Sequence, residues 1–319
     1  MSMAARRMGC FYYNGWELGP INTMSARARR SDLLQKRLEQ FTKLLHELGE
    51  GDVRALHRTR VASRRLREIL PVLQLKADVS SRLSRRLKRV TEELGRVREL
   101  DVLLGLVAEL RDSGRYDAQA LRRVSIALAA EESDARAKLE ERLPIGGLHR
   151  IGRKLEKLGD DLRGRKPSKG WRWAVDARVT RRADTLVHAL DAAGPIYLQE
   201  RLHDVRIALK KFRYALEISS EASGIRLGSD AKALKKAQDI LGRLHDVQVL
   251  IDRVRQIQPA VALPDLTTWR KMDGLVNALE NDCRRLHAKF LQRQGQVRAT
   301  CERVTRADGG GPAKRAVAS

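Results

Sequence analysis

The stretch LHRTRVASRRLREIL at residues 56–70 places a histidine at the head of a basic helical sequence, and LHDVRIALKKFRYAL at residues 202–216 repeats this layout. The two histidines, His57 and His203, are 146 positions apart in the chain. The basic positions that follow them also match, as Arg60 with Arg206, Arg64 with Lys210, and Arg67 with Arg213. A histidine-led basic helix that occurs twice at matched spacing indicates an internal duplication.

The next segment repeats as well. LKRVTEELGRVRELDVL begins at Leu87, and LKKAQDILGRLHDVQVL begins 147 positions later at Leu234. Gly95 and Gly242 stand at the same place in both copies, and an interior glycine costs a helix about 1 kcal/mol relative to alanine. We therefore expect a close helix–helix approach at these glycines. The chain divides into a first helical half at 25–165 and a second at 170–295.

Apolar residues recur at spacings of three and four from residue 25 to about residue 295, a pattern typical of helices. Aromatic residues make up only 4% of the chain, which argues against a β-rich core. The sequence predicts an all-α fold of two pseudo-symmetric bundles with about four long helices each. We expect a disordered leader at 1–24 and a disordered tail at 303–319, and both Met1 and Met24 remain open as the start of translation.

The charge of the chain is strongly positive and unevenly distributed. Its 64 Lys and Arg residues exceed its 40 Asp and Glu residues by 24. Residues 54–98 alone hold 14 basic and 4 acidic residues, so the excess is concentrated on a repeated helix pair and is not a uniform compositional bias. Such an excess opposes compaction and suggests a polyanionic partner. Nucleic acid, an anionic membrane surface and an inorganic polyanion are the candidates.

A helical projection separates the charges from the apolar residues, since successive residues turn by about 100°. From His57, the side chains of Arg60, Arg64 and Arg67 fall on one stripe, and Leu66 and Ile69 fall opposite. The second copy gives the same stripe. The candidate anion-binding residues on the two stripes are His57, Arg60, Arg64, Arg67, His203, Arg206, Lys210 and Arg213. A second set of basic residues, on the following helices, comprises Arg85, Arg89, Arg96, Lys232, Lys236 and Arg243.

At these four motifs the sequence resembles the CHAD family, the conserved-histidine α-helical domain, over about residues 25–295. The resemblance implies two pseudo-symmetric four-helix bundles whose basic surfaces form a central groove or pore. It also implies non-enzymatic binding of inorganic polyphosphate by the candidate residues, and a cytoplasmic protein that associates with polyphosphate granules. Glu217 departs from the first-half pattern, because it falls on the basic stripe of the second copy. It would either orient an arginine or exclude a phosphate.

Two other functions remain as alternatives. Nucleic-acid binding would require aromatic stacking platforms or a known reading motif, and the basic helices offer at most one tyrosine per histidine stripe. A polyphosphate-processing enzyme would require acidic metal ligands beside the basic rows. The acidic residues nearest these rows are predicted to be salt-bridge partners of arginines, namely Glu92, Glu93, Glu99 and Asp101.

Further site types find little support in the sequence. Cys10, Cys283 and Cys301 are few and far apart, which indicates neither a disulfide framework nor a CxxC metal site and suits a reducing cytosol. The seven histidines form no metal-binding motif, so we expect no metal and no cofactor. No apolar run reaches the 18 or more residues of a membrane span. The sequence leaves the oligomeric state open.

Overall fold

The computed structural model of the chain describes residues 30–49, 53–164, 170–224, 227–260 and 266–308. Every regular element in these residues is helical, which confirms the predicted all-α class. The first half contains α1 (Arg30–Gly49), α2 (Val53–Ile69), the 3-10 helix η1 (Leu70–Val72), α3 (Ala77–Asp112), α4 (Ala118–Arg142) and α5 (Ile145–Arg163). The second half contains α6 (Gly170–Ala193), α7 (Gln199–Ser223), α8 (Gly228–Ile257), the 3-10 helix η2 (Gln258–Ala260) and α9 (Leu266–Asp308).

The two halves differ in one connection. A shift of about 147 positions places α6, α7 and α8 on α1, α2 and α3, and it places the single helix α9 on α4 and α5 together. The break between α4 and α5 lies at Pro144, which precedes the first residue of α5. Proline has no backbone N–H and clashes with the preceding turn, so the helix ends there. The corresponding position in α9 is Leu291, and that helix continues.

The predicted end of the second half was too early. The helix α9 continues to Asp308, beyond the predicted boundary at 295 and through the start of the predicted tail. The signal was present in the sequence, because Val297, Cys301 and Val304 follow at helical spacing and the first two are buried in the second-half core. Gly295 concealed this periodicity. The predicted leader and residues 309–319 of the tail lie outside the described residues.

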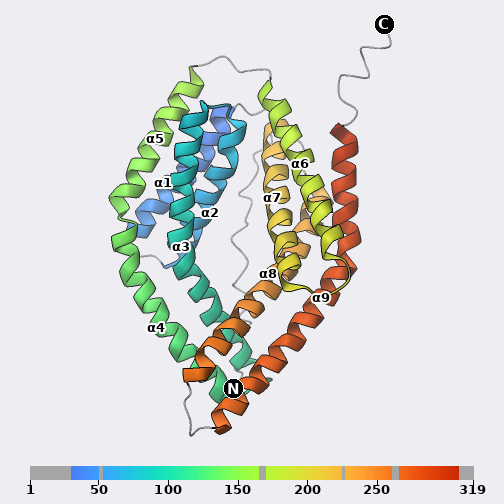
Figure 1. Cartoon of the computed structure of the whole chain (residues 1–319). Helices are drawn as coiled ribbons and strands as arrows, with labels where there is room; N and C mark the ends of the chain where they lie inside the picture. Colours follow the sequence, from blue (N-terminus) through green and yellow to red (C-terminus); the bar gives the residue numbers. More distant parts are fainter. Residues whose placement is uncertain (1–29, 50–52, 165–169, 225–226, 261–265, 309–319) are drawn as a thin grey trace, which may run out of the picture.

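Three apolar cores hold the described helices together. The first-half core joins α1, α2, α5 and the first part of α3, with Phe41 and Leu66 fully buried. The second-half core joins α6, α7, the first part of α8 and the last part of α9, around Phe212 and Phe290. A third core is shared by both halves. We call this region the junction; it packs the last part of α3 and the first part of α4 against the last part of α8 and the first part of α9 (Figure 1).

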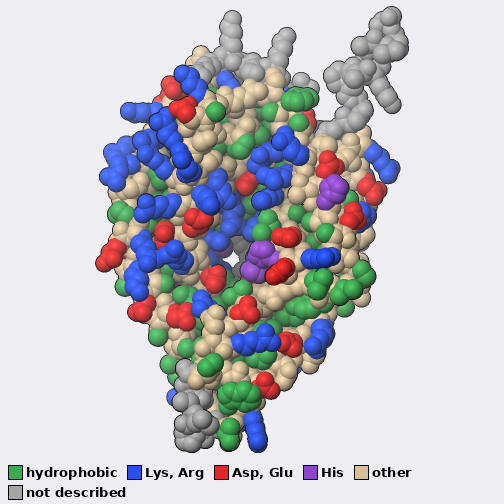
Figure 2. Space-filling model, viewed as in Figure 1, with side chains coloured by type: hydrophobic (Ala, Val, Ile, Leu, Met, Phe, Trp, Pro, Cys, Tyr) green, Lys and Arg blue, Asp and Glu red, His purple; other side chains and the backbone are tan. Residues whose placement is uncertain are grey.

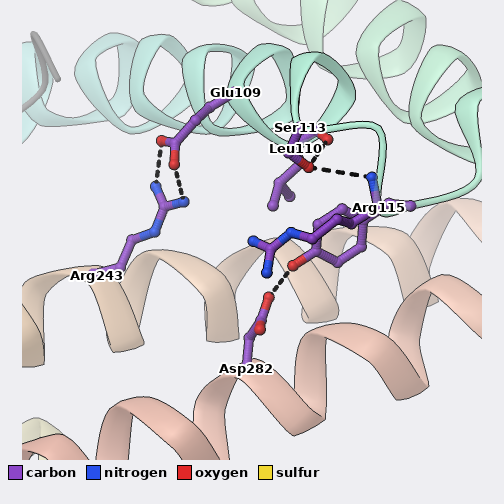
Figure 3. A network of polar contacts seen from close by, with 7 residues as sticks. Glu109, Leu110, Ser113, Arg115, Arg243 and Asp282 are labelled. Atoms are coloured by element: carbon purple, nitrogen blue, oxygen red, sulfur yellow. Dashed lines mark hydrogen bonds and ion pairs between the residues drawn. The ribbon is translucent and has the colours of Figure 1, made fainter. Parts of the chain in front are cut away.

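Polar contacts strengthen the junction. The Arg243 guanidinium of α8 donates two hydrogen bonds to the Glu109 carboxylate of α3, at 2.8 and 2.7 Å, as Figure 3 shows. The Tyr116 hydroxyl, between α3 and α4, donates to the Asp282 carboxylate of α9. These contacts link the two halves.

The halves also meet at the opposite end, in a region we call the distal contact. There Arg37 of α1 pairs with Glu221 of α7 at 2.8 Å, and Arg178 of α6 pairs with Glu68 of α2 at 2.7 Å. Trp171 of α6 is buried in the first-half core. The junction and the distal contact therefore bound the space between the halves at both ends.

Candidate cationic binding site

The histidine-bearing stripes of α2 and α7 approach each other between the two contact regions. The charges of Arg60 and Arg64 on α2 act on the amine of Lys210 on α7, although these residues belong to different halves. Figure 2 shows a hollow at this level, with Lys and Arg side chains gathered on the first-half side and His side chains at the second-half edge. We call this group the central cationic cluster; it comprises His57, Arg60, Arg64, Arg98, His203, Arg206, Lys210 and His245.

Burial lowers the pKa of each histidine of the cluster. Burial lowers the pKa of His57 to about 4, and the charges of Arg98, Arg60 and Arg64 lower it further in the same direction. Burial also lowers the pKa of His245 to about 3, with Arg206 as its main charged neighbour. The rings of His203 and His245 lie with their centroids 5.0 Å apart, so a positive charge on one opposes a charge on the other.

Burial and neighbouring charges also lower the pKa values of the Lys210 and Arg60 side chains. Burial lowers the pKa of Lys210 to about 6, and Arg64, Arg206 and Arg60 add to the effect. Burial lowers the pKa of Arg60 to about 10, with Arg64 as its first cationic neighbour. Burial and an uncompensated like charge both disfavour the protonated form of a base. Within the described residues, Asp204 is the only carboxylate among the causes of these shifts, and it acts on His203 alone.

Gly95 provides the space for Arg60. A Cβ atom at position 95 would lie 3.2 Å from Arg60 Nε and 3.5 Å from its Nη2. The atoms within 4 Å of this position belong to a guanidinium group, so the close helix–helix approach expected at Gly95 is not what the glycine accommodates. Gly95 on α3 therefore helps to place a cation of α2 at the edge of the cluster.

A cavity of about 940 Å³ opens beside the cluster, between α2, α3, α4 and α8. Arg60, Arg64 and Arg67 line its α2 wall, so the basic stripe of this helix continues from the cluster into the cavity. Glu99 and Glu131 lie on the other side, within 3.9 and 3.3 Å of the Arg253 guanidinium. The cavity thus has one cationic wall and one wall of paired charges.

Arg67 and Arg213 are matched in sequence but placed differently. Arg67 lines the cavity. Arg213 is only 4% exposed and its Nε lies 3.3 Å from the Glu217 carboxylate. The prediction that Arg213 contacts a ligand conflicts with this burial, because its guanidinium is engaged inside the second half. Of the two roles expected for Glu217, the structure shows the pairing with an arginine.

The second set of candidate residues does not converge on the cluster. Arg85 and Arg89 are exposed on α3, and Arg89 donates to the backbone carbonyl of Arg142 at 3.4 Å. Arg96 lines the cavity and pairs with Glu93 at 3.4 Å. These three side chains therefore lie on the outer surface or the cavity rim.

Their counterparts on α8 lie elsewhere too. Lys232 and Lys236 line a smaller hollow of about 370 Å³ against α9, together with Arg293 and Arg303. Arg243 is held by Glu109 in the junction. On a helix with about 100° per residue, these three positions lie roughly opposite His245. The predicted second set thus lies on the wrong face of the helix to reach the cluster.

The sequence reasoning missed Arg98 and His245, which supply α3 and α8 to the cluster. They are equivalent positions, since LGRVREL and LGRLHDV align when the 147-residue offset is applied. The signal that could have identified them is a residue able to carry positive charge at the same place in both copies. The prediction chose instead the arginines two positions earlier, Arg96 and Arg243, which lie on the other face of each helix.

The carboxylates beside the basic rows form ion pairs, as predicted. Glu92 lies 3.5 Å from Lys88, and Glu93 lies 3.4 Å from Arg96. Asp101 lies 2.8 Å from Arg136 of α4. Among the described residues, no group of three His, Cys, Asp or Glu side chains has an arrangement that could hold a metal ion.

The CHAD domain family model matches residues 32–255, and the chain belongs to this family. Two solved structures share the fold. PptA from Streptomyces chartreusis is 20% identical, with a TM-score of 0.60 over 83% of this chain and 98% of that chain. The CHAD domain from the plant Ricinus communis is also 20% identical, with a TM-score of 0.55 over 91% of this chain and 95% of that chain. No curated protein matches the sequence.

Among the described residues, no helix is both long enough and apolar enough to cross a membrane.

Proposed function

We propose that this protein binds inorganic polyphosphate in the central cationic cluster, without converting it, and that it associates with polyphosphate granules in the cytoplasm. The observation that supports the proposal is the convergence of basic side chains from four helices of both halves. Burial and mutual repulsion lower the pKa values of His57, Arg60 and Lys210. A bound anion would relieve both costs, because it supplies the opposite charge that the cluster lacks.

The chemistry of the cluster suits phosphate oxygens. Arginine offers a planar fork that donates two hydrogen bonds to a phosphate group. Arg60 Nε and His57 Nδ1 are buried and have no hydrogen-bond partner within the described residues. Such buried polar atoms are rare in proteins and call for an explanation, such as a ligand that pairs with them.

A linear polymer fits the arrangement better than a single phosphate does. The basic stripe of α2 extends from the cluster along the cavity wall through Arg60, Arg64 and Arg67. Polyphosphate carries negative charges at short, regular intervals and no sequence, so successive phosphates would meet successive cations. Family membership supports the same proposal, since CHAD domains are linked to polyphosphate binding.

Nucleic acid is the competing ligand. Single-stranded nucleic acids are usually held by aromatic rings on which bases stack. Tyr214, on the second histidine-bearing helix, is only 4% exposed and offers no open ring face. A row of cations without a stacking platform favours a polyanion that has no bases.

A competition titration tests the proposal. Labelled long-chain polyphosphate bound to the protein at physiological salt would be displaced with unlabelled polyphosphate, double-stranded DNA and RNA at equal phosphate concentration. We expect polyphosphate to compete best and its affinity to fall steeply with salt, as counterion release requires. More effective displacement by either nucleic acid would overturn the assignment.

The absence of turnover is tested separately. The protein would be incubated with polyphosphate and Mg²⁺, and released phosphate and the chain-length distribution would be measured over time. We expect no release above the rate without protein. A protein-dependent release that the triple variant His57→Ala, Arg60→Ala, Arg64→Ala abolishes would show an enzyme.

A further inference from the structure

The second half carries a basic hollow on the face of α8 that points away from the central cationic cluster. This hollow, which we call the outer hollow, has a volume of about 370 Å³ and lies between the first part of α8 and the last part of α9. Four basic residues line it, Lys232 and Lys236 on α8 and Arg293 and Arg303 on α9, against one acidic residue, Asp230. Pockets that hold small ligands typically measure about 300–1,000 Å³, so the outer hollow is large enough for one.

The single carboxylate of the outer hollow does not neutralise its lysines. Asp230 pairs with the Arg303 guanidinium and accepts a hydrogen bond from the Thr300 hydroxyl at 3.4 Å. Arg293 donates at 3.5 Å to the side-chain oxygen of Gln296, which carries no charge. In the described part of the chain, neither Arg293 nor either of the two lysines forms an ion pair. Three of the four cations thus line the outer hollow without an opposite charge beside them.

The cations are spread along the outer hollow and do not gather at one point. Lys232 and Lys236 are four residues apart, which is about one turn of α8. Arg293 and Arg303 are ten residues apart on α9, which corresponds to about 15 Å along the helix axis. Both ammonium and guanidinium groups bind phosphate oxygens. An elongated anion with several charges can therefore contact cations of both walls, and a chain of phosphates has this shape.

The first half does not repeat the cations of the α9 wall. The 147-residue offset places Arg85 and Arg89 of α3 at the positions of the two lysines, and both arginines are exposed. The same offset places Gly146 and Glu156 of α5 where α9 has its two arginines. One wall is therefore cationic in both halves, whereas the other is cationic in the second half alone. Arg85 and Arg89 provide a control with the same charges at the matched positions.

We propose that the outer hollow is a second binding site for phosphate chains, and that it holds a short stretch of such a chain. The lysines of the outer hollow lie roughly opposite His245 on α8, so different segments can fill the outer hollow and the central cationic cluster at once. One protein molecule can then bridge two polyphosphate chains. The bridging role rests on the proposed function, but the binding of an oligophosphate in the outer hollow does not.

Lysine footprinting of the full-length protein tests the site. Tripolyphosphate is the probe, N-hydroxysuccinimidyl acetate is the reagent, and site-resolved mass spectrometry measures the rate of acetylation. The reference residues are Lys154 and Lys157, which are exposed on α5. A bound anion covers the ammonium groups and favours their protonated, unreactive form, so acetylation of Lys232 and Lys236 should slow at least about threefold. The two reference lysines should change little.

Two controls separate the outer hollow from general charge effects and from the central cationic cluster. Sulfate at the same ionic strength should protect little. Protection by tripolyphosphate should persist in the triple variant His57→Ala, Arg60→Ala, Arg64→Ala, because the outer hollow uses none of these residues. Equal slowing at all four lysines, the same slowing with sulfate, or loss of protection in the triple variant would overturn the proposal. None of these results alters the competition titration, which tests the proposed function separately.

Bridging is tested by the capture of a second chain. Biotinylated long-chain polyphosphate on beads would bind the protein, and a fluorescent chain would then be added below saturation. Lys232→Gln with Lys236→Gln should lower capture of the fluorescent chain severalfold, while the beads retain nearly as much protein. Arg85→Gln with Arg89→Gln removes the same number of charges and should capture the chain as the unchanged protein does. Equal capture by both double variants would overturn the bridging role of the outer hollow.

Discussion

The two halves meet in two different ways, at the junction and at the central cationic cluster. In the junction, opposite charges pair across the interface, as Arg243 does with Glu109, and an apolar core lies beneath them. In the cluster, cations from α2 and α7 face one another, and burial together with their proximity lowers the pKa of Lys210. The same interface is thus complementary in one place and self-repelling in another.

This difference shows where the fold gets its stability. The distal contact and the junction hold α2 and α7 at a fixed separation, with ion pairs such as Arg37 to Glu221 at 2.8 Å. Favourable contacts in the rest of the structure then offset the repulsion within the cluster, so the cluster itself does not need paired charges. Sites that store such unfavourable interactions are typically functional.

The largest expected effect comes from removing residues of the central cationic cluster, where like charges repel. Changing His57, Arg60 and Arg64 together to alanine should weaken polyphosphate binding by at least about 100-fold, since each lost charged hydrogen bond costs about 1.5–3 kcal/mol. Because like charges are removed, the melting temperature of the free protein should not fall. The measurements are a titration with long-chain polyphosphate and thermal unfolding followed by circular dichroism.

A matched control separates position from total charge. His57 is neutral near pH 7, so the triple variant loses two positive charges, as does Arg122→Ala with Arg123→Ala on the exposed face of α4. The control should keep most of the affinity. Equal losses in both variants would mean that the whole surface, and not the cluster, attracts the polymer.

The second prediction concerns pH. Folding lowers the pKa of His57 from 6.5 to about 4, so its contribution to stability is complete above about 6.5 and is lost as the pH falls towards 4. For Lys210 the corresponding loss runs from 10.5 down to about 6. A bound polyanion raises both pKa values. Binding should therefore take up protons and become tighter, by up to about tenfold per pH unit for each proton, as the pH falls from about 8 to 6.

Isothermal titration in two buffers of different ionisation enthalpy measures this proton uptake directly. The observed enthalpies should differ by the number of protons bound multiplied by the difference in buffer enthalpy. In parallel, the melting temperature of the free protein should fall over the same pH range. Identical enthalpies in both buffers would show that binding takes up no protons, which contradicts the prediction.

The third prediction tests the junction, where opposite charges pair. Arg243→Ala removes the two hydrogen bonds to Glu109, and because both partners are partly exposed it should lower the free energy of unfolding by only about 0.5–1 kcal/mol. Polyphosphate affinity should stay within about twofold, since one exposed charge contributes little. A loss of affinity like that of the triple variant would return Arg243 to the binding site.

The smallest effect is expected at Gly95. In Gly95→Ala the new Cβ lies 3.2 Å from Arg60 Nε and forces the guanidinium to shift, so polyphosphate affinity should fall by about threefold, or about 0.7 kcal/mol. Gly274→Ala on α9 is the control, because a Cβ there meets nothing within 4 Å. The control should gain helix stability without a change in affinity. Similar affinity in both variants would show that Arg60 does not depend on the space above Gly95.

The sequence predicted the helices well, because leucine periodicity and glycine or proline breaks act locally. The predicted start of the second half at residue 170 coincides with the first residue of Gly170–Ala193, and the repeated segment from Leu234 lies within the continuous helix Gly228–Ile257. The third core was not predicted. It depends on how far α3 and α8 extend past their own bundles, and that is a tertiary property which periodicity does not encode.

The candidate site was predicted in part. The stripe of α2 was identified because its charges repeat every three or four residues, and Lys210 was identified because it matches Arg64 across the repeat. Arg213 was misplaced, since a helical projection gives the direction of a side chain but not what it meets there. Arg98 and His245 were missed because the prediction followed the helix face on which arginines are densest. The face that packs inward is the better guide to the site.

The proline break in the first half has a mechanical consequence. The helix α9 is one continuous rod of 43 residues that belongs to both the junction core and the second-half core. Its counterpart is two shorter rods, α4 and α5, joined at Leu143 and Pro144. A continuous helix in one half and a jointed pair in the other mean that the two halves differ in stiffness. The first half should therefore adjust more readily than the second when a polymer needs more room.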